Sequence, residues 1–241
     1  MSNENLIIGI DVGSTTTKIA IVRDNKMIYH KYIRHFARQR ESIITLLNEA
    51  KDVIGNDNFK YCMTGSGARN LAKRIDVPFT QEVVANSIAL KKEYDKVGTA
   101  IELGGQDAKI IFFREDDNEE PQVYDMRMNG SCAGGTGAFI DQMAALLQTD
   151  ASGLNEYAKH YRSLYSIAAR CGVFAKTDIQ PLINEGATRE DLAASIFQAV
   201  VNQTISGLAC GKPIRGNVAF LGGPLHFLSE LRQAFIRTLK L

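Results

Sequence analysis

The chain lacks a charge imbalance and a long apolar run, and each absence removes a class of function. Its 241 residues include 28 basic and 27 acidic ones, so the formal net charge of +1 gives no basis for binding nucleic acid or an anionic membrane. No apolar run approaches the roughly 20 residues that span a bilayer, and the first residues contain no signal-peptide core. We expect a cytoplasmic protein whose partners include no nucleic acid and no membrane.

Two common nucleotide-binding motifs are also missing. The P-loop spacing does not occur, because the segment 207–213 is one residue short and has Pro213 where the Mg²⁺-binding hydroxyl belongs. The segment 65–70 lacks the third glycine of a dinucleotide fingerprint. We interpret both segments as ordinary turns.

Two short segments, 8–18 and 101–109, do share one design. Each has an apolar run, an acidic residue, a glycine turn and a lysine that leads into a second apolar run. This pattern predicts a β-hairpin whose turn can bring backbone N–H groups close to an anion, since glycine has no Cβ to hold a phosphate away. The acidic residues, Asp11 and Glu102, could each hold Mg²⁺ through water. The repetition predicts two lobes that close on one nucleotide.

The order of the expected elements repeats as well, which indicates an internal duplication of architecture. We place the lobe boundary near 95–98, so that the predicted lobes are residues 1–95 and 96–241. Strands are expected at 6–11, 18–22, 27–33, 59–64, 99–103, 109–113, 122–128 and 217–221. Helices are expected at 41–54, 83–94, 138–147, 154–161, 174–184, 189–208 and 228–239.

A third glycine turn, Gly222 and Gly223, follows a strand and precedes a helix, so a nucleoside could lie against its backbone. With this turn the chain resembles the actin/Hsp70/sugar-kinase superfamily, whose members bind ATP with two phosphate hairpins and a later Gly-Gly adenosine turn. The resemblance implies an α/β protein with the two-lobed ribonuclease H-like (ASKHA) ATPase fold.

Two of the four cysteines stand in an unusual context. Cys132 lies in a glycine-rich segment and Cys171 lies beside Gly172. Each comes directly before an expected helix, and a helix N-terminus favours the thiolate that binds metal. Two thiolates cannot complete a four-cysteine cluster, but a C2 dimer can supply four. The alternative is that both are small buried residues, as free cysteines commonly are. Cys62 and Cys210 lack this context, and we expect them to be structural.

The segments 11–18, 101–109, 129–139 and 170–175 together resemble the activator ATPases of 2-hydroxyacyl-CoA dehydratases, the BadF/BadG/BcrA/BcrD-type activase family. The cysteine segments are the specific part, because kinases, actins and chaperones of this fold lack them. The resemblance implies a homodimer with one [4Fe–4S] cluster held by Cys132 and Cys171 of both chains. It also implies that a ferredoxin or flavodoxin supplies an electron, which ATP hydrolysis passes at low potential to a partner dehydratase or related reductase.

The resemblance further implies roles for single residues. Asp11 and Glu102 would organise Mg²⁺, and Gln106 or Asp107 would position the attacking water. Gly222 and Gly223 would face the adenosine of ATP or ADP. The phosphates would be held by Gly13, Ser14, Thr15, Thr16, Lys18, Gly104 and Gly105.

Three features depart from the family pattern. The chain stops at Leu241, where the family usually continues with a further strand and helix, so we expect a truncated second lobe or one domain of a larger activase. Glu102 stands where aspartate is more usual, and Pro224 follows the Gly-Gly turn in place of a small residue.

Two other functions stay open at this point. A small-molecule kinase of the same fold would use an aspartate such as Asp107 as its catalytic residue and would leave the cysteines without a role. A nucleotide sensor would bind ADP without turnover. Arg34, His35, Arg38 and Arg40 form a small basic patch that could meet an acidic electron donor, although a solvated loop is the simpler interpretation.

Overall fold

A computed structural model gives the fold and describes residues 6–94, 96–114, 122–129, 135–168 and 172–241. The chain divides into two compact units, Met1–Leu90 and Lys91–Leu241, each with its own four-stranded sheet. This division falls a few residues before the predicted boundary of the lobes, near the end of a helix at Glu82–Glu93.

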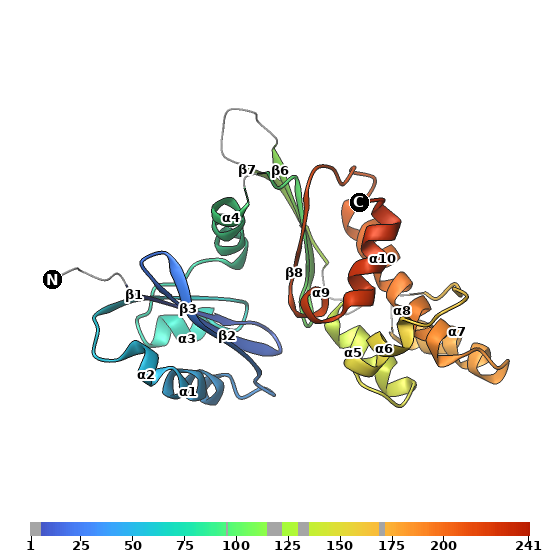
Figure 1. Cartoon of the computed structure of the whole chain (residues 1–241), viewed down its shortest axis with the longest axis horizontal. Coiled ribbons are helices and arrows are strands. Elements are labelled where there is room, and N and C mark those ends of the chain that lie inside the picture. Colours follow the sequence, from blue (N-terminus) through green and yellow to red (C-terminus); the bar gives the residue numbers. More distant parts are fainter. Residues whose placement is uncertain (1–5, 95, 115–121, 130–134, 169–171) are drawn as a thin grey trace. The chain divides into compact units, whose positions relative to one another are not determined.

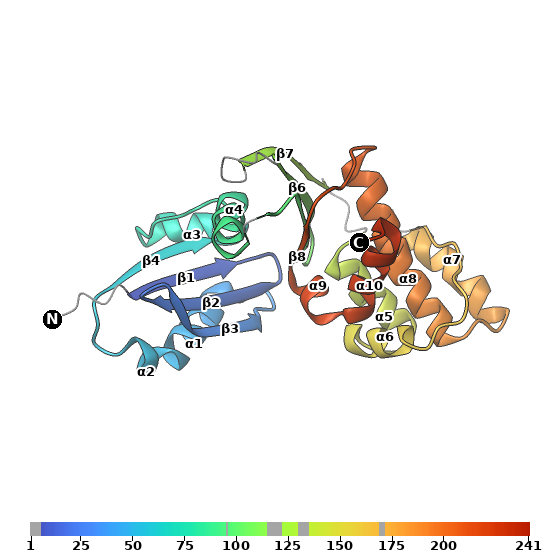
Figure 2. The same cartoon turned by 45° about the horizontal axis from the view of Figure 1, so that its top comes forward.

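The sheet of unit 1 has the strand order β3-β2-β1-β4, in which β1 pairs antiparallel with β2 and parallel with β4 (Figure 1; Figure 2). Its strands are β1 (Leu6–Val12), β2 (Thr16–Arg23), β3 (Lys26–Arg34) and β4 (Phe59–Thr64). Its helices are α1 (Gln39–Glu49), α2 (Lys51–Ile54), α3 (Arg69–Arg74) and α4 (Glu82–Glu93).

The core of unit 1 follows from the period-two pattern of its strands. Leu6 and Ile8 on β1 and Ile21 on β2 are buried on the same face, where they pack with Leu46 of α1 and with Ala50. Burying each large aliphatic side chain contributes about 1.5–3 kcal/mol. The helix expected at 41–54 ends as α1 before Ala50 and continues as the short α2.

The sheet of unit 2 has the order β7-β6-β5-β8 and repeats the topology of the first. Its strands are β5 (Thr99–Leu103), β6 (Ala108–Arg114), β7 (Gln122–Met128) and β8 (Val218–Leu221). Its helices are α5 (Gly137–Leu146), α6 (Ala151–Ala158), α7 (Gly172–Asn184), α8 (Arg189–Thr204), the π-helix η1 (Ile205–Ala209), α9 (Gly223–Phe227) and α10 (Ser229–Leu239).

The helix α8 forms the centre of unit 2. Its residues Ile196, Phe197 and Val200 are at most 1% exposed and belong to the same cluster as the buried strand β5. The stretch Arg189–Ala209 is long and apolar enough to cross a membrane by length and composition, yet 67% of its apolar 18-residue window is buried, as in the core helix of a globular domain.

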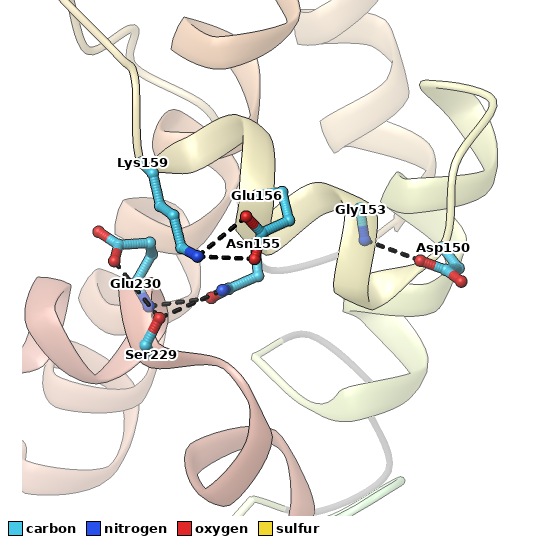
Figure 3. A network of polar contacts seen from close by, with 7 residues as sticks. All are labelled: Asp150, Gly153, Asn155, Glu156, Lys159, Ser229 and Glu230. Carbon is cyan, nitrogen blue, oxygen red and sulfur yellow. Dashed lines mark hydrogen bonds and ion pairs between the residues drawn. The ribbon is translucent and has the colours of Figure 1, made fainter.

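A polar contact joins α6 to the start of α10 (Figure 3). The buried Asn155 of α6 donates to Ser229 Oγ over 3.2 Å and accepts from the backbone N–H of Glu230 over 2.9 Å. The N-cap residue of α10 is Leu228, whose side chain cannot accept a hydrogen bond. Asn155 of α6 therefore supplies the capping acceptor that Leu228 cannot provide. The helix expected at 228–239 begins at this contact, as α10.

Candidate functional site

The turn between β1 and β2 carries the first predicted hairpin. The Gly13 N–H donates to Thr16 O over 2.9 Å and closes the turn. Asp11 and Lys18 are register partners, and Lys18 Nζ lies 2.5 Å from Asp11 Oδ2. The second carboxylate oxygen, Oδ1, is buried and has no hydrogen-bond partner among the described residues. A buried acceptor without a donor is costly, so this oxygen fits a ligand such as a Mg²⁺-bound water.

The segment after β4 lies against this carboxylate. Gly65 has φ +99°, and a Cβ there would stand 2.3 Å from Val12 O and 2.4 Å from Asp11 Oδ1. The Gly67 N–H donates to Val12 O over 2.8 Å. Thr64 is the register partner of Asp11, and its buried Oγ1 also has no partner in the described part of the chain.

We interpreted the segment 65–70 as an ordinary turn, and its place beside Asp11 was missed. The signal that could have found it is a Gly-x-Gly that directly follows a strand. In this fold that strand, β4, lies parallel to β1 and ends beside it. Residues 69–74, within or directly after this segment, form the helix α3, whose single buried residue, Ala72, leaves no periodic pattern to detect.

An open cavity of about 470 Å³ lies beside the first hairpin, lined in part by His35, Phe36, Arg38 and Ser42. His35 is only 5% exposed. Arg34, His35 and Arg38 of the predicted basic patch all line this cavity, but His35 is buried, so the exposed part of the patch is its arginines.

The second hairpin, between β5 and β6, repeats the acid–lysine pairing. Glu102 and Lys109 are register partners, and Lys109 Nζ lies 3.2 Å from Glu102 Oε1. Both side chains are less than 10% exposed. The Gly104 N–H donates to Asp107 O over 2.7 Å and closes the turn, with Gln106 exposed at its tip. A buried ion pair adds little to the free energy of unfolding, because the cost of desolvating both charges offsets their attraction. The recurrence of the acid–lysine pair in both hairpins therefore favours a functional role.

The segment that carries Cys132 begins and ends on this second turn. Asn129 donates its backbone N–H to Ala108 O over 3.0 Å, and its side-chain Oδ1 accepts from the Ala108 N–H over 2.7 Å. At the other end, the first two N–H groups of α5 bond the turn: Gly137 to Gly104 O over 2.9 Å and Ala138 to Gly105 O over 2.8 Å. Cys132 itself lies outside the described residues.

The Gly-Gly turn packs on the same end of the sheet. Gly222 has φ +89°, and a Cβ there would stand 2.0 Å from Leu103 O, so only glycine fits. The Pro224 ring approaches the start of α5, where a Cβ on Gly137 would meet it at 3.2 Å. Pro224 stands in the first turn of α9, a position that tolerates proline. The second hairpin, the Gly-Gly turn and the start of α5 thus meet in unit 2.

The helix that follows Cys171 packs on the helix that follows Cys132. A Cβ on Gly172, the first residue of α7, would stand 2.4 Å from Gln142 Oε1 of α5. The Ala168 N–H donates to Asp178 Oδ2 of α7 over 2.8 Å. Cys171 also lies outside the described residues, but its neighbours Ala168 and Gly172 are both fixed to these helices.

The two other cysteines are free thiols. Cys62 is half-buried with its Sγ 3.2 Å from Thr80 Oγ1, and Cys210 is exposed and donates to Gly207 O over 3.2 Å. Within residues 6–94, 96–114, 122–129, 135–168 and 172–241, no group of three His, Cys, Asp or Glu side chains could hold a metal ion.

Two sheets of one topology, each with a glycine hairpin that follows an acidic strand end, define a protein of the actin/Hsp70/sugar-kinase fold. Two distant solved structures, 11% and 16% identical with TM-scores of 0.59 and 0.54, share this fold alone. The model of the BadF/BadG/BcrA/BcrD ATPase family matches residues 8–240, so the chain belongs to that family.

The chain is similar to several proteins named as activators or components of 2-hydroxyacyl-CoA dehydratases. The (R)-2-hydroxyglutaryl-CoA dehydratase activating ATPase of Acidaminococcus fermentans is 29% identical over 90% of this chain and 82% of its own. The crystal structure of the Acidaminococcus fermentans dehydratase component A is 28% identical, with a TM-score of 0.84 over 98% of this chain and 90% of that one. The activator of the 2-hydroxyisocaproyl-CoA dehydratase from Clostridium difficile, solved with bound ADPNP, is 25% identical, with a TM-score of 0.83 over 98% and 86%.

Proposed function

We propose that this protein is an ATP-dependent reductive activator, which passes one low-potential electron to a partner 2-hydroxyacyl-CoA dehydratase or related reductase. One observation carries the proposal: the segment with Cys132 begins and ends on the second glycine hairpin. The names of three relatives, each 28–29% identical and each an activator of such a dehydratase, support the choice of partner.

The described residues fit a magnesium nucleotide. The orphaned Asp11 Oδ1 is the kind of oxygen that accepts a hydrogen bond from a Mg²⁺-bound water. Glu102 would do the same from the second hairpin, and Gln106 or Asp107 would position the attacking water. Lys18, the backbone of residues 13–16 and that of Gly104 and Gly105 would hold the phosphates. Gly222 and Gly223 would leave room for the adenosine.

The cysteine pair fits a cluster shared between two chains. Cys132 and Cys171 supply two thiolates, and a homodimer supplies the four that a [4Fe–4S] cluster needs. When bound, such a cluster provides a one-electron carrier that a ferredoxin or flavodoxin can reduce. The packing of Gly172 on Gln142 supports a common location, because it joins the helices that follow the two cysteines.

The anchors on the second hairpin give the nucleotide a physical route to the cysteine segment. A ligand shifts a conformational equilibrium only through contacts that differ between its states, and ATP and ADP differ at the γ-phosphate. The turn that would contact the γ-phosphate contains Gly104 and Gly105. Their carbonyl oxygens accept the hydrogen bonds from the N–H groups of Gly137 and Ala138. A displacement of this turn would therefore move the start of α5 and, through Ala108, Asn129.

Anaerobic purification with iron analysis tests the proposal. We expect about four irons per two chains and ATP turnover that continues when an electron donor is present. Cys132→Ala and Cys171→Ala should each remove the iron, whereas the matched control Cys210→Ala should keep it. A full cluster in Cys132→Ala, or a colourless wild-type protein that phosphorylates a small molecule, would contradict the proposal.

A further inference from the structure

We propose that His35 is a positioning residue that orients the first hairpin for phosphate binding. The inference rests on the proposed function only in taking the turn at residues 13–16 as a phosphate site. His35 directly follows β3, outside the hairpin, and is 5% exposed. Its buried imidazole and its backbone both bond the turn.

Every polar atom of His35 has a partner. The imidazole Nε2 donates to Gly13 O over 3.1 Å, and the backbone N–H donates to Thr15 O over 3.1 Å. On the other side of the ring, the Ala37 N–H donates to Nδ1 over 3.1 Å. Because a carbonyl can only accept and an amide N–H can only donate, these contacts assign the ring proton to Nε2. The Arg38 N–H donates to His35 O over 2.7 Å.

The two carbonyls that His35 holds fix the direction of two amides. The Gly13 carbonyl belongs to the same peptide group as the Ser14 N–H, and the Thr15 carbonyl to the same group as the Thr16 N–H. In a planar trans peptide the C=O and N–H point in opposite directions. With both carbonyls turned toward His35, the N–H groups of Ser14 and Thr16 point to the far side of the turn. N–H groups that point to one side of a turn can together bind an anion.

The backbone next to His35 is strained in a way that serves this contact. Phe36 and Ala37 have φ of 46° and 62°, two consecutive non-glycine residues in the left-handed region. This conformation costs free energy for residues with a Cβ, and such strain persists where the surroundings require it. The tight bend returns the Ala37 N–H to Nδ1 and leaves Phe36 79% exposed. The bend thus holds the imidazole in the tautomer that donates to Gly13.

Binding of ADP and of adenosine to three His35 variants tests the inference. Adenosine has no phosphate, so it does not reach the first hairpin. His35→Ala should weaken ADP binding about 10-fold, because a preorganised turn is lost, and leave adenosine binding unchanged. His35→Gln can place an N–H donor near the position of Nε2 and should stay within about 3-fold of wild type. His35→Asn matches Nδ1 instead and should behave like His35→Ala.

The matched control is His30→Ala, which removes an exposed histidine from β3 and should change neither affinity. Unchanged ADP affinity in His35→Ala, or equal losses for ADP and adenosine, would overturn the inference. If His35→Ala does not fold, the comparison of the Gln and Asn variants decides, and equal affinities for ADP would overturn it. Failure of the wild-type protein to bind ADP would instead sink the proposed function, which separates the two.

Discussion

At the scale of single residues, Asp11 has two carboxylate oxygens in unlike surroundings. Oδ2 pairs with Lys18, and Oδ1 is buried without a partner in the part of the chain that the structure describes. The ion pair itself is partly exposed and contributes only about 0–1 kcal/mol to stability. Asp11 therefore matters for the ligand it can serve and little for the fold.

We expect Asp11→Asn to separate turnover from stability. The amide keeps the shape of the side chain but loses the charge that stabilises Mg²⁺ and its waters, so kcat for ATP hydrolysis should fall about 100-fold. The melting temperature should change little. Asp57→Asn, which breaks the exposed Arg23–Asp57 pair, is the matched control and should hydrolyse ATP normally. Equal turnover in both variants would remove Asp11 from the site.

Gly65 offers a second prediction, because Gly55 provides a near-perfect control. Both glycines have positive φ, but a Cβ on Gly55 meets nothing within 4 Å, whereas one on Gly65 would collide with Val12 O and Asp11 Oδ1. Gly55 has φ 62° and ψ −139°, a conformation that residues with a Cβ rarely adopt, so Gly55→Ala should cost about 1–3 kcal/mol from backbone strain alone. Gly65→Ala should cost about 4 kcal/mol or displace Asp11 and abolish ATP turnover. Urea unfolding and ATPase assays on both variants would measure the difference, and similar losses would show that the segment 64–67 does not support the acid.

The sequence could reveal the hairpins but not everything that packs on them. The acid, the glycine turn and the lysine lie within a few residues, so the pairs Asp11–Lys18 and Glu102–Lys109 follow from local strand register. The contact of Gly65 with Asp11 depends on the parallel pairing of β1 with β4, and that of His35 with Gly13 depends on β3. Such contacts join residues far apart in the chain, so local sequence patterns cannot predict them.

At the scale of elements, backbone hydrogen bonds join the second hairpin to the start of α5. Two backbone bonds fix the start of α5 to the turn, and Asn129 fixes the end of β7 to Ala108. The predicted helix at 138–147 agrees closely with α5, but its attachment to the turn involves only main-chain atoms, which no residue pattern specifies. The element that would carry a nucleotide signal is thus defined by backbone contacts.

Asn129→Ala should weaken the coupling between ATP hydrolysis and reduction of the partner without slowing hydrolysis itself. The variant keeps the backbone bond to Ala108 O and loses the bond that the side chain accepts from the Ala108 N–H. ATP hydrolysis should stay within about 3-fold of wild type, while ATP-dependent reduction of the partner dehydratase should fall about 10-fold. Asn217→Ala removes a comparable side-chain bond, to Lys96 O, and should lose neither activity. Parallel losses of hydrolysis and reduction in Asn129→Ala would argue against a coupling role.

The start of α8 predicts an acid-sensitive step in the stability of unit 2. Asp191 accepts hydrogen bonds from the backbone N–H groups of Arg162 and Ser163, over 2.6 and 2.9 Å, and these hold the pKa of its carboxyl below the usual value. A lowered pKa stabilises the fold above the unfolded value of about 3.9 and loses that effect as the pH falls through the folded value. Asp191→Asn should therefore be less stable than wild type at pH 7, and the gap should narrow as the pH falls below about 4. Urea unfolding at pH 7, 4 and 3 would measure it, and a gap of the same size at pH 7 and pH 3 would contradict the assignment.

At the scale of the whole molecule, the repeated topology is what the repeated hairpin pattern predicted. Each unit has three antiparallel strands and a fourth that pairs parallel with the first, so both acids stand at the end of an inner strand. The proposed [4Fe–4S] cluster needs four thiolates, of which Cys132 and Cys171 of one chain would supply two. If the cluster is shared between two chains, the protein should bind iron only as a dimer.

We expect iron and dimer to be lost together. The anaerobic wild-type protein should sediment as a dimer of the 26.5-kDa chain with about four irons per two chains. Cys171→Ala removes half of the thiolates, so it should lose the iron and shift toward monomer at low micromolar concentration, because a shared ligand set contributes to the association free energy. Cys62→Ala is the matched control, since Cys62 lies in unit 1 beside Thr80, and it should keep both iron and dimer. Sedimentation velocity with iron analysis on each fraction would measure the two together, and a monomer that carries four irons would show that the ligands come from one chain.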